Sequence, residues 1–277
     1  MGDLNREYVG KSYPPKTFTV EAERTIAYAL ATNDENPWYV DRSREGGIIA
    51  PPLFAVAPAG ELLIESLTDM QLGVPLDRTL HGEQDMYFIS PIRPGDKLVT
   101  EAKILDMTDT STGETMTTEV VTKTEGGELR CRSLAIAYVR HPEKKKNSQP
   151  EPEVDRGASL VEQSMKVTDD QPLRYAEASG DHNPPHVNED FAKAIGFRTV
   201  ILQGLCTMAF TSMAVIDALC AGNPTRLKRL KVRFSKVVYP GDVLTTSIWT
   251  QGGNYTFQTA NQDGVLVIKD GVAEIES

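Results

Sequence analysis

Residues 175–192 read Tyr-Ala-Glu-Ala-Ser-Gly-Asp-His-Asn-Pro-Pro-His-Val-Asn-Glu-Asp-Phe-Ala. Asp181 and His186 lie five positions apart, and the glycine, asparagine and two prolines around them disfavour regular helix or strand. The stretch therefore predicts a rigid loop that presents a carboxyl group and an imidazole together. Such a pair can exchange protons with a bound molecule near neutral pH.

Two interpretations of this pair are open on the residues alone. In the first, Asp181 and His186 hold one water or one substrate hydroxyl between them and move its protons. In the second, Asp181 caps a helix that begins near Asn188 or closes an Asx turn, and His186 is a partly buried ring bonded to backbone. For an isolated Asp and His the second interpretation is the more common one.

The residues around the pair form a longer pattern, Tyr-x-x-x-Ser-Gly-Asp-x-Asn-Pro-x-His, followed after five residues by Ala. This pattern resembles the signature of the MaoC-like, R-specific (type 2) enoyl-CoA hydratases, which have a hot-dog fold. The chain meets it at Tyr175, Ser179, Gly180, Asp181, Asn183, Pro184, His186 and Ala192. Eight positions at fixed spacing make a specific signal, which favours the first interpretation.

The resemblance implies roles for several residues. Asp181 and His186 would be the catalytic pair, and Asn183 would help to order it. The backbone N–H of Gly204 would bind the thioester oxygen as it becomes enolate-like. The physical chemistry agrees, because the first N–H groups of a helix lack internal acceptors and carry partial positive charge.

Two positions depart from the family pattern. Pro185 stands where an aliphatic residue is usual, and it should stiffen the loop. Gln203 replaces a His that commonly precedes the glycine, so any pH dependence tied to that His is in doubt, although Gln can still donate a hydrogen bond. Gln203 and Leu205 flank Gly204 and are expected to contact the substrate.

The charge of the chain limits its partners. The 277 residues carry a formal net charge of −10, which argues against nucleic acid, since its phosphates would be repelled. An acyl-CoA would need a local basic patch. The candidates are Lys228, Arg229, Lys231, Arg233 and, separately, Arg198. The alternative is that the first four form an ordinary solvated strand edge.

The sequence predicts no metal site, no cofactor and no membrane span. Three cysteines, Cys131, Cys206 and Cys220, lie in apolar runs without metal-ligand or disulfide spacing, so we expect reduced packing residues. The long apolar segment 199–221 is interrupted by polar residues and glycine and is expected to be a buried helix. Neither end resembles a targeting signal, which predicts a cytoplasmic location.

The chain repeats itself. Asp34 precedes Asp181 by 147 positions, with similar neighbours, and Pro94 precedes Pro240 by 146 positions in matching Pro-Gly-Asp triplets. Two such agreements indicate a duplicated domain. The charged, proline-rich segment 141–155 predicts a linker, so we expect domains at 1–140 and 156–277.

Each half shows helical patterns followed by short β-rich runs. Helices are predicted at 21–31, 59–67, 171–179 and 207–219. Strands are predicted at 84–89, 98–107, 114–124, 129–140, 230–238, 243–250, 255–260 and 265–273. This order indicates an α+β fold, and the resemblance implies a tandem (double) hot-dog, with an antiparallel sheet wrapped around a central helix in each half.

The first half lacks the expected chemistry. Asp34 is retained, but Tyr39 replaces the imidazole, and a phenol is a poor base at neutral pH. Pro51 and Pro52 stand where the second half has Gln203 and Gly204, and proline has no N–H to offer an oxyanion. We therefore expect the first half to be catalytically silent.

The resemblance implies a hydro-lyase that interconverts a trans-2-enoyl thioester and an (R)-3-hydroxyacyl thioester, carried on CoA or acyl carrier protein. Two alternatives stay open: a hot-dog thioesterase, and a non-catalytic acyl-thioester-binding or assembly subunit. A homodimer is a further open alternative for its assembly.

Overall fold

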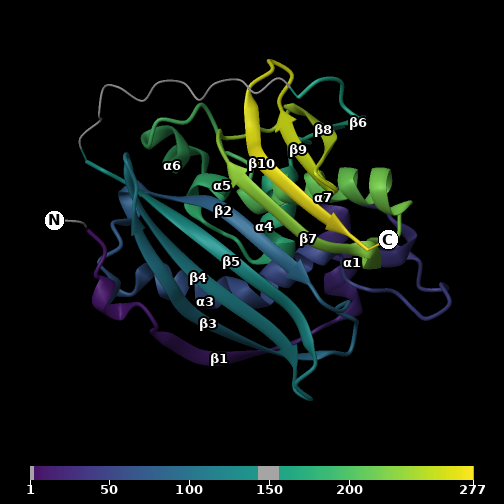
Figure 1. Cartoon of the computed structure of the whole chain (residues 1–277), viewed down its shortest axis with the longest axis horizontal. Coiled ribbons are helices and arrows are strands. Elements are labelled where there is room, and N and C mark those ends of the chain that lie inside the picture. Colours follow the sequence, from purple (N-terminus) through teal and green to yellow (C-terminus); the bar gives the residue numbers. More distant parts are fainter. Residues whose placement is uncertain (1–2, 143–155, 277) are drawn as a thin grey trace.

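The computed structural model describes residues 3–142 and 156–276. The strands form one ten-stranded sheet in the order β1-β3-β4-β5-β2-β7-β10-β9-β8-β6, and the neighbouring strands are antiparallel. Figure 1 shows the sheet curving over the helices, with the strands of the first half in purple to teal and those of the second in teal to yellow.

The elements follow the duplication. The first half comprises β1 (Ser12–Thr19), α1 (Ala22–Ala31), α2 (Pro37–Val40), α3 (Val56–Thr68), β2 (Thr79–Phe88), β3 (Lys97–Asp109), β4 (Gly113–Thr124) and β5 (Leu129–Arg140). The second comprises β6 (Val161–Lys166), α4 (Gln171–Ser179), α5 (Pro184–Val187), α6 (Glu189–Ala194), α7 (Gly204–Cys220), β7 (Leu227–Phe234), β8 (Val243–Gln251), β9 (Asn254–Ala260) and β10 (Leu266–Ile275). Short 3-10 turns are η1 (Arg6–Tyr8), η2 (Pro52–Ala55), η3 (Met70–Leu72), η4 (Leu76–Arg78) and η5 (Pro224–Arg226).

Each half packs its sheet on a central helix. Along β4 and β5, buried and partly exposed residues alternate, as expected when one face of a sheet covers a core. Helix α7 is apolar on most of its surface and contacts strands β6, β7, β8 and β10. Helix α3 contacts β1, β3 and β4 in the same way.

The halves join where β2 pairs with β7. Asp85 lies opposite Lys231 in this pairing, and the two are 146 positions apart, so each is the repeat counterpart of the other. An approximate two-fold axis therefore relates the halves. Near this axis, the Tyr28 hydroxyl on α1 lies 3.0 Å from the Tyr175 hydroxyl on α4, and the main core cluster contains residues of both halves.

The predicted α+β double hot-dog architecture is confirmed, although two edge strands and the short helices α2 and α5 were not predicted. Edge strands β1 and β6 were not expected, because β1 contains Pro14 and Pro15 at a register shift and β6 is polar. Edge strands tolerate proline and bury little side-chain surface, so their sequence signal is weak. Strand β7 also ends at Phe234, before the predicted 238. Most of the predicted linker lies outside the described residues.

Within the described ranges, no helix combines the length and apolar character needed to cross a lipid bilayer.

Candidate active site

The predicted loop is partly helical. Helix α4 ends at Ser179, and Gly180 follows with a left-handed φ of 85°, a conformation that glycine adopts without strain. Asn183 and Pro184 then begin α5, a single helical turn that contains His186. Proline is favourable at this first helical position. His186 is therefore held by a short helix, contrary to the expected irregular loop.

The environment of Asp181 decides between its two structural interpretations. Its Oδ1 accepts a hydrogen bond from the Asn183 N–H at 3.3 Å, which forms an Asx turn. It does not cap α6, because the side chain of Asn188 accepts from Phe191 N–H at 2.9 Å there. Asn183 thus orders the carboxylate through its backbone, as the resemblance implies. Within the described residues, Oδ2 of Asp181 is left for a bound molecule.

His186 has a defined tautomer. Its Nδ1 lies 2.8 Å from the carbonyl oxygen of Ile201. Because a carbonyl only accepts, Nδ1 carries the proton, and the neutral ring has its lone pair on Nε2. The side chain is partly buried. The backbone contact expected of a structural histidine therefore also prepares Nε2 to act as a base.

Gly204 is the first residue of α7, with Gln203 as its N-cap. Its N–H has no intrahelical acceptor, and the helix dipole adds positive potential there. A Cβ at this position would lie 3.3 Å from the ring of Phe234, so glycine lets that ring approach closely. Leu205, the next residue, is partly buried against the core.

Gln203 ties these parts together. Its side chain is buried, and its Nε2 donates to the carbonyl oxygens of Pro172 at 3.0 Å and Asp181 at 3.3 Å. The carboxylate loop is thereby joined to the start of α7. The segments that carry Asp181, His186 and Gly204 are connected by the carbonyl oxygen of Ile201, which contacts His186, and by the side chain of Gln203, which contacts the backbone of Asp181. Gln203 supplies a donor at the position where the family commonly has His.

The predicted phosphate patch on β7 is an array of ion pairs. Lys231 pairs with Glu83 at 3.0 Å and Arg233 with Asp270 at 2.7 Å. The other members, Lys228 and Arg229, pair with Glu276, Asp85 and Glu274. Strand β7 is also interior to the sheet, between β2 and β10. The solvated-edge alternative is therefore corrected, whereas phosphate contact by these paired residues stays a prediction.

Arg198 is different, because it lies outside this array. Its guanidinium stacks on Tyr239 at 4.0 Å from the ring centroid and reaches Asp242 at 3.4 Å. The side chain is 62% exposed. It stays a candidate for contact with a substrate phosphate, since an exposed, stacked guanidinium keeps donors available.

The first half repeats the geometry with different side chains. Asp34 Oδ1 accepts from Asn36 N–H at 3.0 Å, as Asp181 does from Asn183. Asp34 is only 8% exposed, and burial raises its pKa to about 6. Tyr39 is fully buried. Pro52 begins η2 at the place where Gly204 begins α7, so no N–H is available.

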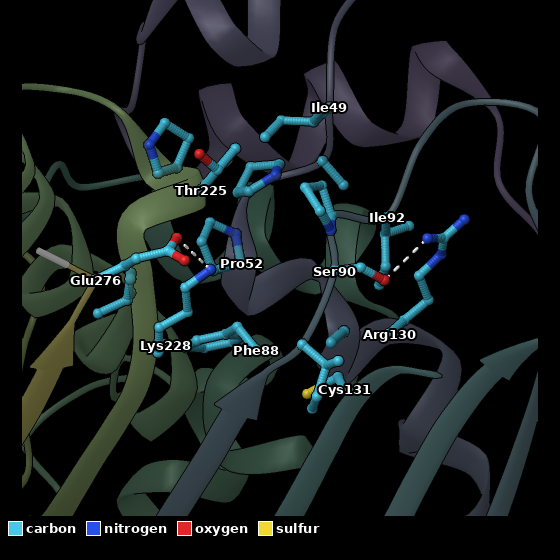
Figure 2. Close-up of a pocket in the computed structure, with 17 residues that line it drawn as sticks. Ile49, Pro52, Phe88, Ser90, Ile92, Arg130, Cys131, Thr225, Lys228 and Glu276 are labelled. Carbon is cyan, nitrogen blue, oxygen red and sulfur yellow. Dashed lines mark hydrogen bonds and ion pairs between the residues drawn. The ribbon is translucent and has the colours of Figure 1, made fainter. Parts of the chain in front are cut away.

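A pocket of about 140 Å³ lies beside Pro52, and Figure 2 shows its lining. Phe88 forms one wall, the Lys228–Glu276 ion pair a second and the Arg130–Ser90 hydrogen bond a third. This is the first-half counterpart of the space beside Gly204, since Phe88 precedes Phe234 by 146 positions. The side chain of His81, which the sequence did not indicate, lies beside Phe234.

Comparisons with known proteins agree with this geometry. Residues 153–270 match the MaoC-like domain, and residues 7–130 match the FAS1-like dehydratase domain region. A probable enoyl-CoA hydratase 2 of Dictyostelium discoideum is 30% identical over 241 residues, which cover 82% of this chain and 81% of that protein.

Solved structures show the same fold. The MaoC-like dehydratase from Phytophthora capsici superposes with a TM-score of 0.86 at 23% identity, over 99% of this chain and 98% of that one. A Mycobacterium tuberculosis protein described as a double hotdog fold superposes with a TM-score of 0.60 at 12% identity, over 96% of both chains. At these identities the likeness concerns the fold alone.

Proposed function

Since the chain belongs to the MaoC-like dehydratase family, we propose that it interconverts a trans-2-enoyl thioester and an (R)-3-hydroxyacyl thioester at the site formed by Asp181, His186 and Gly204. One observation carries this assignment of residues. The hydrogen bonds from Gln203 to the Asp181 carbonyl and from His186 to the Ile201 carbonyl connect the segments that carry the acid, the base and the helix N-terminus, which supports this assignment.

In the hydration direction, Nε2 of His186 takes a proton from a water that Asp181 also holds. The resulting hydroxide forms the new C–O bond at the β-carbon, and electron density moves to the thioester oxygen. The N–H of Gly204 stabilises this enolate-like oxygen. The carboxylic acid of Asp181 then delivers its proton to the α-carbon, and the proton held by His186 returns to Asp181 before the next turnover; dehydration reverses these steps.

The reaction is tested with crotonyl-CoA by following ultraviolet absorbance together with free thiol. Loss of enoyl absorbance without free thiol is the expected result. Release of thiol would instead indicate a thioesterase, and binding without either change would indicate a non-catalytic subunit.

The residue roles are tested by Asp181→Asn and His186→Gln. Each should lower kcat by at least about a hundredfold, the scale for losing a positioned proton-transfer group. Asp34→Asn and His182→Gln are matched controls, because Asp34 is the buried first-half counterpart and His182 is an exposed neighbour in the loop. Losses as large in the controls would contradict the assignment.

A further inference from the structure

A β-bulge aims His81 at the candidate site. The register of β2 against β5 shifts between His81 and Glu83, which leaves Gly82 as the extra residue. Regular alternation would place His81 and Gln84 on opposite faces of the sheet, whereas one extra residue places them on the same face. They do share a face, because His81 Nε2 lies 2.9 Å from Gln84 Oε1.

Gln84 sets the protonation of His81. Gln84 is buried, and its Nε2 donates to Ser133 Oγ, so its Oε1 is the atom that faces the imidazole. An amide oxygen only accepts, and therefore Nε2 of His81 carries the proton. Burial lowers the pKa of His81, against smaller opposing effects of the Gln84 hydrogen bond and the Asp181 charge. The ring is thus neutral near pH 7 with its lone pair on Nδ1, and a backbone hydrogen bond at Glu83 also acts on the imidazole.

The ring borders the space in front of Gly204. It packs on Phe234 with 4.9 Å between ring centroids and an interplanar angle of 59°, and Phe234 is the side chain that covers Gly204. Asp181 is close enough to act on His81 electrostatically. His81 nevertheless stays accessible to solvent. His81 therefore lies beside the aromatic ring that covers the start of α7 and within electrostatic reach of Asp181.

The duplicated half supplies an internal comparison. The counterpart of His81, 146 positions later, is Leu227, which is 1% exposed and lines the first-half pocket together with Phe88. The aromatic partner is thus kept on both sides of the two-fold axis. At the position beside Gly204, in the half that is expected to be catalytic, the side chain is the imidazole of His81. At the corresponding position beside Pro52, it is the aliphatic side chain of Leu227.

We propose that His81, supplied by the first half, is a substrate-positioning residue whose Nδ1 accepts a hydrogen bond from the hydroxyl on the β-carbon of the 3-hydroxyacyl thioester. This rests on the proposed function. That hydroxyl oxygen comes from the water that Asp181 and His186 hold, and Asp181 is within electrostatic reach of His81. The enoyl thioester has no hydroxyl, so His81 binds the 3-hydroxyacyl thioester in preference to the enoyl thioester.

The test is His81→Phe, which keeps an aromatic ring against Phe234 and removes both nitrogens. The KM for (3R)-hydroxybutyryl-CoA should rise about 5- to 10-fold, as expected for one lost hydrogen bond, and the KM for crotonyl-CoA should change less than about twofold. An enzyme does not change the reaction equilibrium, so kcat/KM must fall by the same factor in both directions. Since the KM for crotonyl-CoA stays nearly unchanged, this loss should appear in the kcat of hydration. His141→Phe is the matched control.

Proportional changes in both KM values, or unchanged constants in a folded His81→Phe, would overturn the proposal. His81→Gln keeps a donor for Gln84 and an amide acceptor, so its KM for (3R)-hydroxybutyryl-CoA should lie between those of the original protein and His81→Phe. His81→Leu introduces the residue type that lines the first-half pocket at the corresponding position, and it should keep the raised KM. If His81→Phe does not fold, as judged by thermal unfolding, the Gln and Leu variants decide by the same KM comparison. Full activity of Asp181→Asn would instead show that the proposed function itself is misplaced.

Discussion

At the scale of single residues, two aspartates with the same local geometry differ in their surroundings. Asp34 and Asp181 each accept a backbone N–H two residues later. Asp34 is buried beside Tyr39, whereas Asp181 is partly exposed in its loop. The sequence offered an Asx turn as one alternative for Asp181, but the burial that separates the chemistry of the two aspartates comes from packing between elements.

The raised pKa of Asp34 has a consequence for stability. Its pKa rises from 3.8 to about 6 on folding because burial disfavours the charged form. The folded state therefore binds the proton more tightly than the unfolded state. This contribution to stability is complete below about pH 3.8 and is lost as the pH rises through about 6.

We predict that Asp34→Asn stabilises the protein at pH 8 by about 1–3 kcal/mol, since each pKa unit corresponds to about 1.4 kcal/mol. The amide oxygen can still accept from Asn36 N–H. At pH 4 the gain should be small, because the carboxyl group is largely protonated there in the folded state. Urea unfolding of both proteins at the two pH values measures this. An equal gain at pH 4 and pH 8 would contradict a titration effect.

At the scale of elements, the two central helices begin and pack differently. Helix α7 starts at Gly204 under the ring of Phe234, whereas α3 follows a 3-10 turn that starts at Pro52. Helix α3 also contains Gly60 in its interior, and a Cβ added there would meet no atom within 4 Å. This glycine is therefore not required by packing within the described structure.

We predict that Gly60→Ala raises the unfolding free energy by about 0.5–1 kcal/mol, because alanine has the higher helix propensity and restricts the unfolded chain. Thermal unfolding should show a small increase in Tm. The control is Gly73→Ala, at φ 71° with a Cβ that would lie 2.5 Å from the carbonyl oxygen of Asp3. That variant should be destabilised, and a decrease in Tm for Gly60→Ala would show that α3 needs the space.

At the scale of the whole molecule, charge complementarity explains the basic residues of β7. Arg229 and Lys231 face Asp85 and Glu83 of β2 across the junction of the halves. If two copies of the second half paired through β7, Lys231 would face basic residues of the other copy, which is destabilising. These side chains therefore favour pairing between the two different halves.

We predict that residues 156–277 produced alone form neither an active monomer nor a stable dimer. Their β7 edge would be exposed, the first-half part of the shared core would be missing, and His81 would be absent. Co-expression with residues 1–142 should restore a soluble, active pair. Size-exclusion chromatography and the crotonyl-CoA assay test this. A stable, active second half on its own would contradict the prediction.

The sequence by itself determined the family, the duplication, the α+β double hot-dog class and most helices and strands. These depend on spacing and periodicity along the chain, which need no knowledge of distant neighbours. The catalytic roles of Asp181, His186, Asn183 and Gly204 stay predictions that the geometry supports.

Only the tertiary structure decided the rest. The ion pairs of Lys231 and Arg233 depend on which strands become neighbours of β7, and their partners lie far away in sequence. His81 reaches the second half because one bulge turns it and the β2–β7 pairing carries it there. Edge strands β1 and β6 are defined by their partners more than by their own composition. Each of these features results from long-range pairing, which local residue patterns do not encode.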